Sequence, residues 1–293
     1  MRLAALAKIN LQLTVTGTRP DGYHELRTVF QSISLHDDLM IERSRRPGIE
    51  LSISGAELDP GPKNLVWRAL DLLSRELRLS GGWRARLEKR IPMGAGLGGG
   101  SSDAATALVG GVRLTGKRIA PERLLEMAAS LGADVPFFLV GGRALGVGRG
   151  DEVYPLEEGR RRWVVVVLPK EIRVATPDAY RWLDAKLTKA ASPPKLFLSC
   201  ARSWSLEDAD LLNAFEAVVF DRYPILREMK RRLLQAGAAG AALAGSGSAV
   251  FGLFQNPAHA RRAARKFQEA QVYVARTVTR GEFGRWGARR REA

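Results

Sequence analysis

The spacing of apolar and polar residues changes along the chain, and these changes predict where strands and helices lie. Alternation with a period of two predicts strands, whereas apolar residues at every third or fourth position predict helices. In the first half, strands are expected over Leu3–Val15, Val29–Leu35, Asp38–Arg43, Ile49–Ser54 and Trp83–Ile91. Helices are expected over Asn64–Leu79, Ser101–Leu114 and Pro121–Leu131, with Asn64 placed to cap the first of them.

The second half mixes strands and helices without a strict βαβ alternation, and this favours an α+β fold over a doubly wound sheet. Its expected strands are Val153–Leu156, Trp163–Leu168, Ala239–Ala244, Ala249–Phe254 and Val272–Val278, and its expected helices are Pro177–Leu187, Leu211–Phe215, Pro224–Ala236 and Pro257–Ala270. The continuous apolar strand Trp163–Leu168 is suited to burial on both faces. The polar stretch Glu157–Arg162 predicts a boundary between domains covering 1–158 and 159–293, and the basic tail 280–293 is expected to fray.

Length and composition are typical of a globular protein. The chain has 293 residues, of which 45% are hydrophobic and 26% charged, and this length favours two domains. Its longest purely apolar run, Trp163–Leu168, is far shorter than the roughly 20 residues that cross a membrane, and the N-terminus lacks a signal-peptide pattern. A single cysteine, Cys200, excludes an internal disulfide, and the three scattered histidines form no zinc motif. We therefore expect a cytoplasmic protein.

The formal charge is +15, from 46 Lys and Arg residues against 31 Asp and Glu residues. The excess is mostly arginine and is spread along the chain, with clusters at 43–46, 159–162, 261–266 and 285–291. Nucleic-acid-binding proteins concentrate such charge and interleave aromatic residues, and no RNP-type, zinc-finger or homeodomain pattern accompanies it here. We expect a solvated basic surface that attracts anionic small molecules, and no nucleic-acid partner.

The segment 92–105, Pro-Met-Gly-Ala-Gly-Leu-Gly-Gly-Gly-Ser-Ser-Asp-Ala-Ala, carries the strongest chemical signal. Glycines let backbone N–H groups come close to an anion, and the helix that follows adds unpaired N–H donors and the positive end of its dipole. The segment is not a Walker A loop, because no Lys-Ser or Lys-Thr follows the last glycine. A flexible surface loop is the alternative, but it does not suit a position between a strand and a helix. The sequence therefore predicts a cradle for a polyphosphate.

Two charged residues lie in apolar surroundings. Asp134 stands between a helix end and the apolar run that contains Phe137 and Phe138, where a partly desolvated carboxylate suits a general base. A residue that merely stops the helix is the alternative. Lys8 lies in an apolar strand close to Asn10, and is either a cation aimed into a site or a gatekeeper on an edge strand.

Two turns are candidates for ligand binding. Tyr23 and His24 follow the turn at Asp21–Gly22 and set an aromatic ring beside a hydrogen-bonding imidazole, which are the groups that a nucleobase site needs. Gly245–Gly247 connects two expected strands and, taken alone, is typical of a hairpin turn.

Taken together, these segments resemble the GHMP kinase superfamily. They are Ala-Lys-Ile-Asn-Leu at 7–11, Asp-Gly-Tyr-His-Glu-Leu at 21–26, Asn-Leu at 64–65, Gly-Leu-Gly-Gly-Gly-Ser-Ser-Asp-Ala-Ala at 96–105, Leu-Gly-Ala-Asp-Val-Pro-Phe-Phe at 131–138, Thr-Pro at 176–177 and Gly-Ser-Gly-Ser at 245–248. They follow the order found in the superfamily. Within the superfamily, the segments are most similar to those of the members that act on a cytidine-diphosphate-linked methylerythritol in the non-mevalonate isoprenoid pathway.

The resemblance implies a fold and a reaction. The N-terminal domain should resemble domain 2 of ribosomal protein S5, and the C-terminal domain should be a ferredoxin-like α/β sandwich. The reaction implied is transfer of the γ-phosphoryl group of ATP, with Mg²⁺, to the 2-hydroxyl of the cytidine-diphosphate-linked methylerythritol, giving the 2-phosphate and ADP. Lys8 and Asp134 match the catalytic lysine and aspartate of the family, and the aspartate takes the proton of the hydroxyl.

The resemblance also implies two sets of binding residues. Those for ATP are Asn64, Lys89, Pro92, Met93, Gly94, Ala95, Gly96, Leu97, Gly98, Gly99, Gly100, Ser101 and Ser102. Those for the acceptor are Asn10, Tyr23, His24, Thr176, Tyr180, Gly245 and Ser246, with the cytosine between the rings of Tyr23 and Tyr180. The family pattern has phenylalanine where this chain has Tyr180, and a tyrosine can stack equally well. Neither the metal ligands nor the oligomeric state follow from the pattern.

Two other functions stay open on the sequence alone. One is a different GHMP kinase, such as a mevalonate or homoserine kinase, and the other is a nucleotide- or nucleic-acid-binding module without catalysis. The pair Tyr23 and His24 favours the cytidine-linked acceptor, because neither mevalonate nor homoserine has a base to stack.

Overall fold

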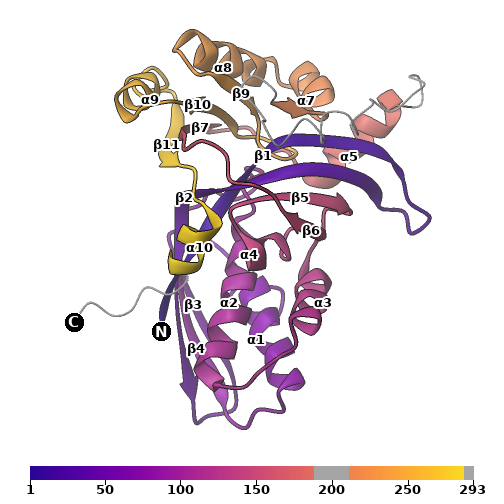
Figure 1. The fold of residues 1–293 in the computed structure, drawn as a ribbon, viewed down its shortest axis with the longest axis vertical. Coiled ribbons are helices and arrows are strands. Elements are labelled where there is room, and N and C mark those ends of the chain that lie inside the picture. The colour runs from indigo at the N-terminus through magenta and orange to yellow at the C-terminus, as the bar shows by residue number, and fades with distance from the viewer. Residues whose placement is uncertain (188–210, 287–293) are drawn as a thin grey trace.

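The computed structural model describes residues 1–187 and 211–286, in which the strands form two sheets (Figure 1). The larger sheet has the order β3-β4-β2-β1-β8, and β5 and β6 extend it beside β2. Its strands are β1 (Arg2–Thr18), β2 (His24–Ser44), β3 (Gly48–Ser54), β4 (Gly82–Glu88), β5 (Arg143–Gly148), β6 (Glu152–Pro155) and β8 (Leu212–Asn213). The smaller sheet, in the order β11-β7-β10-β9, contains β7 (Trp163–Pro169), β9 (Gly240–Leu243), β10 (Val250–Phe254) and β11 (Ala270–Arg276).

Helices pack on both sheets, and the predicted α+β class is confirmed. In the lower half of Figure 1, helices α1, α2 and α4 lie against the larger sheet and α3 packs on α1 and α2. In the upper half, α8 and α9 lie against the smaller sheet and α7 packs on α8. The helices are α1 (Leu65–Glu76), α2 (Gly99–Thr115), α3 (Pro121–Leu131), α4 (Phe137–Val140), α5 (Thr176–Leu187), α7 (Glu216–Arg222), α8 (Pro224–Gln235), α9 (Pro257–Ala264) and α10 (Arg280–Trp286).

Strand β7 is buried on both faces, as the apolar run Trp163–Leu168 predicts. Alternate side chains enter two different cores. Val165 packs in a core with Leu226 of α8, whereas Val166 packs in a core with Ile9 of β1. The smaller sheet is therefore held between its own helices and the long strands β1 and β2, and this position brings the two halves of the chain together.

Strand β2 is one long strand rather than the two predicted over Val29–Leu35 and Asp38–Arg43. It pairs with β5 over residues 26–31 and with β4 over residues 38–44, so it changes its partner on one side while β1 continues on the other. The polar residues between the two predicted strands lie inside the sheet. One of them, Asp37, is completely buried.

The prediction of a helix over Leu211–Phe215 is wrong. The short strand β8 lies there, and it pairs in parallel with Gln12 and Leu13 of β1. The side chain of Asn213 explains the extended backbone, because its Nδ2 donates to the carbonyl oxygens of Leu243 and Gly245, at 2.8 and 2.7 Å. Long-range contacts of this kind override local propensity.

Several smaller features also differ from the predictions. Strand β5 and helices α4 and α7 were not predicted, and α9 ends at Ala264 instead of Ala270. Residues 280–286 form helix α10 instead of a frayed tail, because Phe283 packs against the core of the larger sheet and Glu282 pairs with Arg276 at 3.0 Å. The rest of the predicted tail, 287–293, and Cys200 lie outside the described residues.

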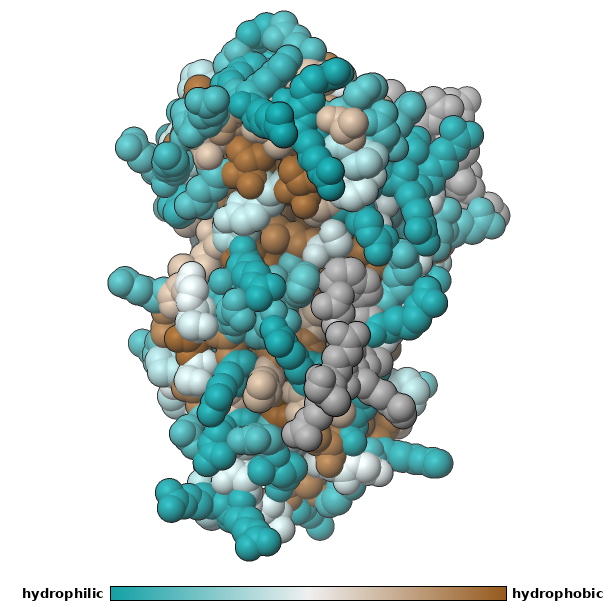
Figure 2. Space-filling view, turned by 90° about the vertical axis from the view of Figure 1, so that its left-hand side faces the viewer, coloured by the Kyte–Doolittle hydropathy of each residue, from teal (hydrophilic) through white to brown (hydrophobic). Residues whose placement is uncertain are grey.

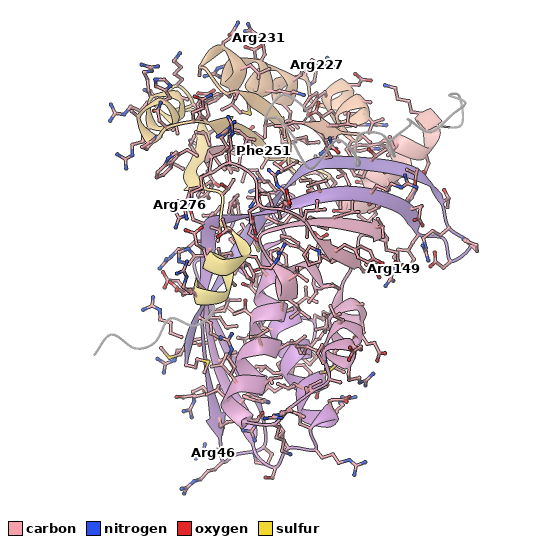
Figure 3. The ribbon with its side chains drawn as sticks, viewed as in Figure 1. Arg46, Arg149, Arg227, Arg231, Phe251 and Arg276 are labelled. Carbon is pink, nitrogen blue, oxygen red and sulfur yellow. The ribbon has the colours of Figure 1, made fainter. Side chains whose placement is uncertain are left out.

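The surface carries hydrophilic side chains over most of the face in Figure 2, with separate hydrophobic areas between them. The arginines labelled in Figure 3 are spread over the length of the molecule, from Arg46 at the lower end to Arg227 and Arg231 of α8 at the upper end. Many are paired with nearby acids, such as Arg227 with Asp221 at 2.8 Å. Within residues 1–187 and 211–286, none of the helices has the length and apolar character needed to span a membrane.

Candidate active site

A cavity of about 910 Å³ lies where the two halves of the chain meet, and it collects the residues that the sequence singled out. Its walls come from β1, β2, the glycine-rich loop 92–98, the start of α2 and the segments around residues 134, 149, 176 and 245. Every predicted site residue lines it except Ser102. The hydroxyl of Ser102 is buried and donates to the carbonyl oxygen of Leu6 at 2.7 Å, so this serine fastens α2 to β1.

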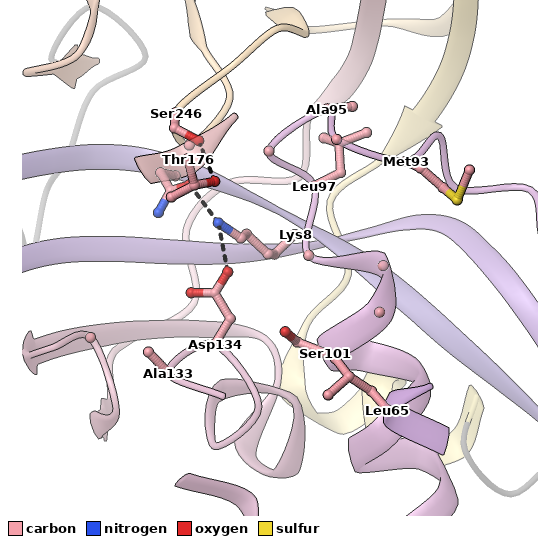
Figure 4. Close-up of a pocket in the computed structure, with 18 of the residues that line it drawn as sticks. Lys8, Leu65, Met93, Ala95, Leu97, Ser101, Ala133, Asp134, Thr176 and Ser246 are labelled. Atoms are coloured by element: carbon pink, nitrogen blue, oxygen red, sulfur yellow. Dashed lines mark hydrogen bonds and ion pairs between the residues drawn. The ribbon is translucent and has the colours of Figure 1, made fainter. Parts of the chain in front are cut away.

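Lys8 and Asp134 form an ion pair inside the cavity (Figure 4), with 3.2 Å between Nζ and Oδ2. The lysine side chain is 5% exposed and the aspartate side chain 35%, so the carboxylate is the more open of the two groups that line the cavity. Lys8 Nζ also donates to Asn10 Oδ1 at 2.9 Å, and Asn10 Nδ2 donates to Thr28 Oγ1 at 2.7 Å. This chain of hydrogen bonds fixes the ammonium group and does not suit an exposed edge-strand gatekeeper. Asp134, likewise, does more than end α3, because its carboxylate faces the cavity.

The glycine-rich loop ends in the N-terminus of α2, which begins at Gly99, two residues earlier than predicted. Its N-cap is Gly98, with φ of +71°, and no side chain of the described residues caps this end. The first N–H groups of α2 are therefore open to a ligand, and the helix dipole favours an anion there. The loop is fixed to β1, because the backbone N–H of Lys8 donates to the carbonyl oxygen of Leu97 at 3.0 Å.

The loop also touches the turn between β9 and β10, which by its own residues predicts a hairpin turn and by the family resemblance contributes Gly245 and Ser246 to the acceptor site. Gly96 has a φ of +78°, and a Cβ atom on it would lie 1.8 Å from the carbonyl oxygen of Ala244. The backbone N–H of Ala249 points at the carbonyl oxygen of Ala95, at 3.4 Å. The turn at Gly245–Gly247 therefore supports the loop from the other half of the chain.

Behind the loop, Lys89 is buried between two carboxylates that sequence reasoning missed. Its Nζ donates to Asp37 and, at 2.6 Å, to Asp103. Burial raises the pKa of the Asp103 carboxyl to about 8, although the charge of Lys89 opposes this. Burial disfavours the charge on Lys89, but Asp103 and Asp37 outweigh it and raise the pKa of the lysine. Asn64 is also predicted to bind ATP. In the structure it caps α1, because its side-chain oxygen accepts the backbone N–H of Val66 at 2.9 Å.

The opposite end of the cavity is lined by three aromatic side chains, of which two are in contact. The ring of His24 stacks on that of Tyr180, with 4.4 Å between centroids, and His24 Nε2 lies 2.7 Å from Asp184 Oδ1. Tyr23 is 56% exposed, and the guanidinium carbon of Arg149 lies 5.0 Å from the centre of its ring. The neighbour of the Tyr180 ring is therefore His24. It is not an open space between Tyr23 and Tyr180, where the cytosine was predicted to lie. Burial raises the pKa of the Tyr180 hydroxyl.

Thr176 and Ser246 complete the wall next to Lys8 (Figure 4). Their hydroxyl oxygens are 3.0 Å apart, which joins α5 to the turn after β9. Polar groups from both halves of the chain thus face the ion pair of Lys8 and Asp134. The N-terminus of α2 lies on one side of this pair, and the aromatic rings lie on the other. This arrangement suits transfer of a phosphoryl group from a nucleotide to a hydroxyl.

Comparison with known proteins identifies the family. Residues 64–142 match the profile of the GHMP kinases N terminal domain, and residues 198–272 match that of the GHMP kinases C terminal. The 4-diphosphocytidyl-2-C-methyl-D-erythritol kinase of Solibacter usitatus (strain Ellin6076) is 44% identical over 286 residues, which cover 96% of this chain and 90% of that protein. The chain belongs to this kinase family. The kinase of the same name from Citrifermentans bemidjiense is 42% identical over 279 residues, covering 95% and 98% of the two chains.

Solved structures agree with this assignment. A crystal structure of 4-(cytidine 5'-diphospho)-2C-methyl-D-erythritol kinase matches with a TM-score of 0.79 and 37% identity, over 94% of this chain and 99% of that one. A homoserine kinase from Cytophaga hutchinsonii matches with a TM-score of 0.72 but 18% identity, over 95% and 94%, and shares the fold alone. The predicted two-domain GHMP kinase fold is confirmed, whereas the boundary at residue 158 stays a prediction.

The residues that sequence reasoning missed in this kinase are mostly charged partners of predicted ones. Asp37 and Asp103 hold Lys89, Asp184 holds His24, and Arg149 covers Tyr23. Asp103 lies inside the glycine-rich motif. Because its acidic side chain is on the inward-facing side of a helix, the sequence alone could have singled it out. The others follow only from the folded arrangement.

Proposed function

We propose that the protein uses ATP to phosphorylate the 2-hydroxyl of 4-diphosphocytidyl-2-C-methyl-D-erythritol, giving the 2-phosphate and ADP. The observation that carries this proposal is the Lys8–Asp134 pair, 3.2 Å apart in a cavity with a helix N-terminus on one side and aromatic rings on the other. The naming of close relatives supports the choice of acceptor.

In the proposed reaction, Asp134 accepts the proton of the acceptor hydroxyl as its oxygen bonds to the γ-phosphorus. The bond between that phosphorus and the β,γ-bridging oxygen breaks, and ADP leaves with the electron pair. Lys8 holds the carboxylate of Asp134 in place and offers positive charge to the transferring phosphoryl oxygens. A tertiary hydroxyl is a hindered nucleophile, so positioning by fixed groups such as Asn10 is expected to matter greatly.

The ATP phosphates are assigned to the loop 92–98 and to the open N–H groups of Gly99, Gly100 and Ser101 at the start of α2. Mg²⁺ would come with ATP. The described residues contain no group of three His, Cys, Asp or Glu side chains placed to hold a metal, and this fits Mg²⁺ bound chiefly by phosphate oxygens and water. The hydroxyl of Ser101, which lines the cavity, would add a ligand, and the metal would neutralise charge on the β- and γ-phosphates.

The cytidine end of the acceptor is assigned to Tyr23, His24 and Tyr180, with Thr176, Gly245 and Ser246 near its diphosphate. Because His24 stacks on Tyr180 in the structure, a cytosine that packs against Tyr180 must share or displace that contact. The cytoplasmic location and the absence of a nucleic-acid partner stay predictions.

The test is release of ADP with four acceptors: the cytidyl substrate, mevalonate, homoserine and galactose. The proposal expects turnover with the first alone, and equal turnover with mevalonate or homoserine would contradict it. Asp134→Asn should lower turnover by about 10²- to 10⁴-fold, the usual contribution of a general base, with the fold kept. Asp71→Asn is the control, since Asp71 pairs with Arg75 on the outer surface of α1.

A further inference from the structure

Three buried ionisable side chains lie behind the glycine-rich loop, outside the groups assigned to the reaction. The side chains of Lys89, Asp37 and Asp103 are exposed by 4%, 0% and 4%. Lys89 Nζ joins the two carboxyl groups, and the other oxygen of Asp37 accepts the backbone N–H groups of Arg90 and Ile91, at 2.5 and 2.8 Å. Such burial is costly unless each charge is well paired.

These three side chains come from different parts of the fold, and they flank the loop on both sides. Asp37 lies within β2, Lys89 directly follows β4, and Asp103 lies in the second turn of α2. The contacts of Asp37 fix residues 89–91, which lead into the loop, and the contact of Asp103 with Lys89 ties in the helix that leaves it. One cluster thus fastens both ends of the loop to the sheet.

The contacts of Lys89 limit what it can offer a nucleotide. Two of the three protons of its ammonium group are directed at carboxylates, so at most one is left for the cavity that the residue lines. Asp103 Oδ1, moreover, has no hydrogen-bond partner among the described residues. The cluster is therefore better arranged to hold backbone in place than to bind phosphate directly. A loop held in its binding conformation loses less entropy when the anion arrives.

We propose that Asp37 is a positioning residue for ATP, which acts through Lys89, Asp103 and the N–H groups of Arg90 and Ile91 to hold the glycine-rich loop in its phosphate-binding shape. The inference rests on the proposed function, because it takes the loop 92–98 as the phosphate site. It assigns Lys89 an indirect part in ATP binding instead of the direct contact with the nucleotide that the family resemblance implies.

The test compares Asp37→Asn with Asp38→Asn. Asp38 is the next residue of β2 and pairs with the guanidinium groups of Arg2 and Arg90, so its loss removes ionic contacts near the loop but none of the hydrogen bonds that Asp37 makes. Calorimetry with ATP should show an affinity lower by roughly 10- to 100-fold in Asp37→Asn, the range for losing hydrogen bonds to a charged group, and little change in Asp38→Asn. The KM for ATP should rise in parallel, with kcat and the KM for the acceptor changed by less than about threefold.

Amide hydrogen exchange gives a second readout, in which the segment 90–98 should exchange faster in Asp37→Asn before ATP is added. Unchanged ATP affinity in a folded Asp37→Asn protein would overturn the positioning role, and so would equal losses for ATP and acceptor. If Asp37→Asn does not fold, the charge-free triple variant Asp37→Asn/Lys89→Met/Asp103→Asn replaces it, and normal ATP affinity there would also overturn the role. Failure of the wild-type protein to bind ATP would instead refute the proposed function.

Discussion

Replacing Gly96 with alanine should separate the glycine-rich loop from the turn that supports it. The new Cβ atom would lie 1.8 Å from the carbonyl oxygen of Ala244 and 2.6 Å from its carbonyl carbon, distances far inside van der Waals contact. Both neighbours are backbone atoms, so no side chain can rotate away. The turn at Gly245 or the loop itself must move.

Gly94 in the same loop provides the matched control. Its φ of +63° resembles the +78° of Gly96, but a Cβ atom on it would find only the Cδ atom of Arg173, at 3.8 Å. Gly94→Ala should therefore cost only the left-handed backbone conformation, about 1–2 kcal/mol. Gly96→Ala should cost that amount and a further 1–3 kcal/mol or so for overpacking, so its loss of stability should exceed that of Gly94→Ala clearly.

Urea unfolding followed by tryptophan fluorescence measures this difference, and calorimetry with ATP measures its consequence for the site. We expect Gly96→Ala to unfold at a lower urea concentration than Gly94→Ala and to bind ATP more weakly. Equal stabilities of the two variants would refute the reasoning, because it would mean that the contact between Gly96 and Ala244 does not constrain the loop.

Three further outcomes follow from the site. Burial raises the pKa of Asp103 in the folded protein above the value of about 4 that it has when unfolded, so the stability it gives is full below about pH 4 and is lost as the pH rises through the raised pKa. Urea titrations at pH 5 and 8 should show Asp103→Asn gaining on the wild type as the pH rises, and a constant difference would contradict this. Tyr23→Ala should weaken acceptor binding by roughly 5- to 150-fold in calorimetry, with ATP affinity almost unchanged. Ser102→Ala should lower the free energy of unfolding by about 1 kcal/mol but leave ATP affinity intact, because the Ser102 hydroxyl does not line the cavity and instead donates to the carbonyl oxygen of Leu6.

The parts of the site that depend on local sequence were predictable. A run of glycines before a helix leaves few other uses than anion binding, and it lies at the cavity as expected. The apolar strand Trp163–Leu168 likewise had to be buried on both faces. Lys8 and Asp134 were predicted separately, but their 3.2 Å contact spans 126 positions of the chain and came only from the family resemblance.

The parts that depend on distant partners were not predictable from local patterns. In the sequence, Asp37 lies in a polar gap between two predicted strands. It is buried, however, because β2 continues through it and because Lys89, directly after β4, pairs with it. Leu212–Asn213 looks helical by its own residues, but hydrogen bonds from Asn213 to Leu243 and Gly245 hold it extended. In each case a polar side chain satisfies groups far away in the sequence, and this gain exceeds a weak local preference.

The same long-range contacts explain why the site needs both halves of the chain. The loop 92–98 follows β4 of the larger sheet but packs against the turn after β9 of the smaller one. Lys8 and Asp134 likewise share the cavity with Thr176 and Ser246 from the second half of the chain. His24 of β2 meets Tyr180 of α5 in the same way. A shift between the two sheets would therefore change the phosphate loop, the Lys–Asp surroundings and the aromatic end together. Binding of ATP and of the acceptor should accordingly be coupled through the packing of β7 against β1 and β2, the layer that fixes the distance between the sheets.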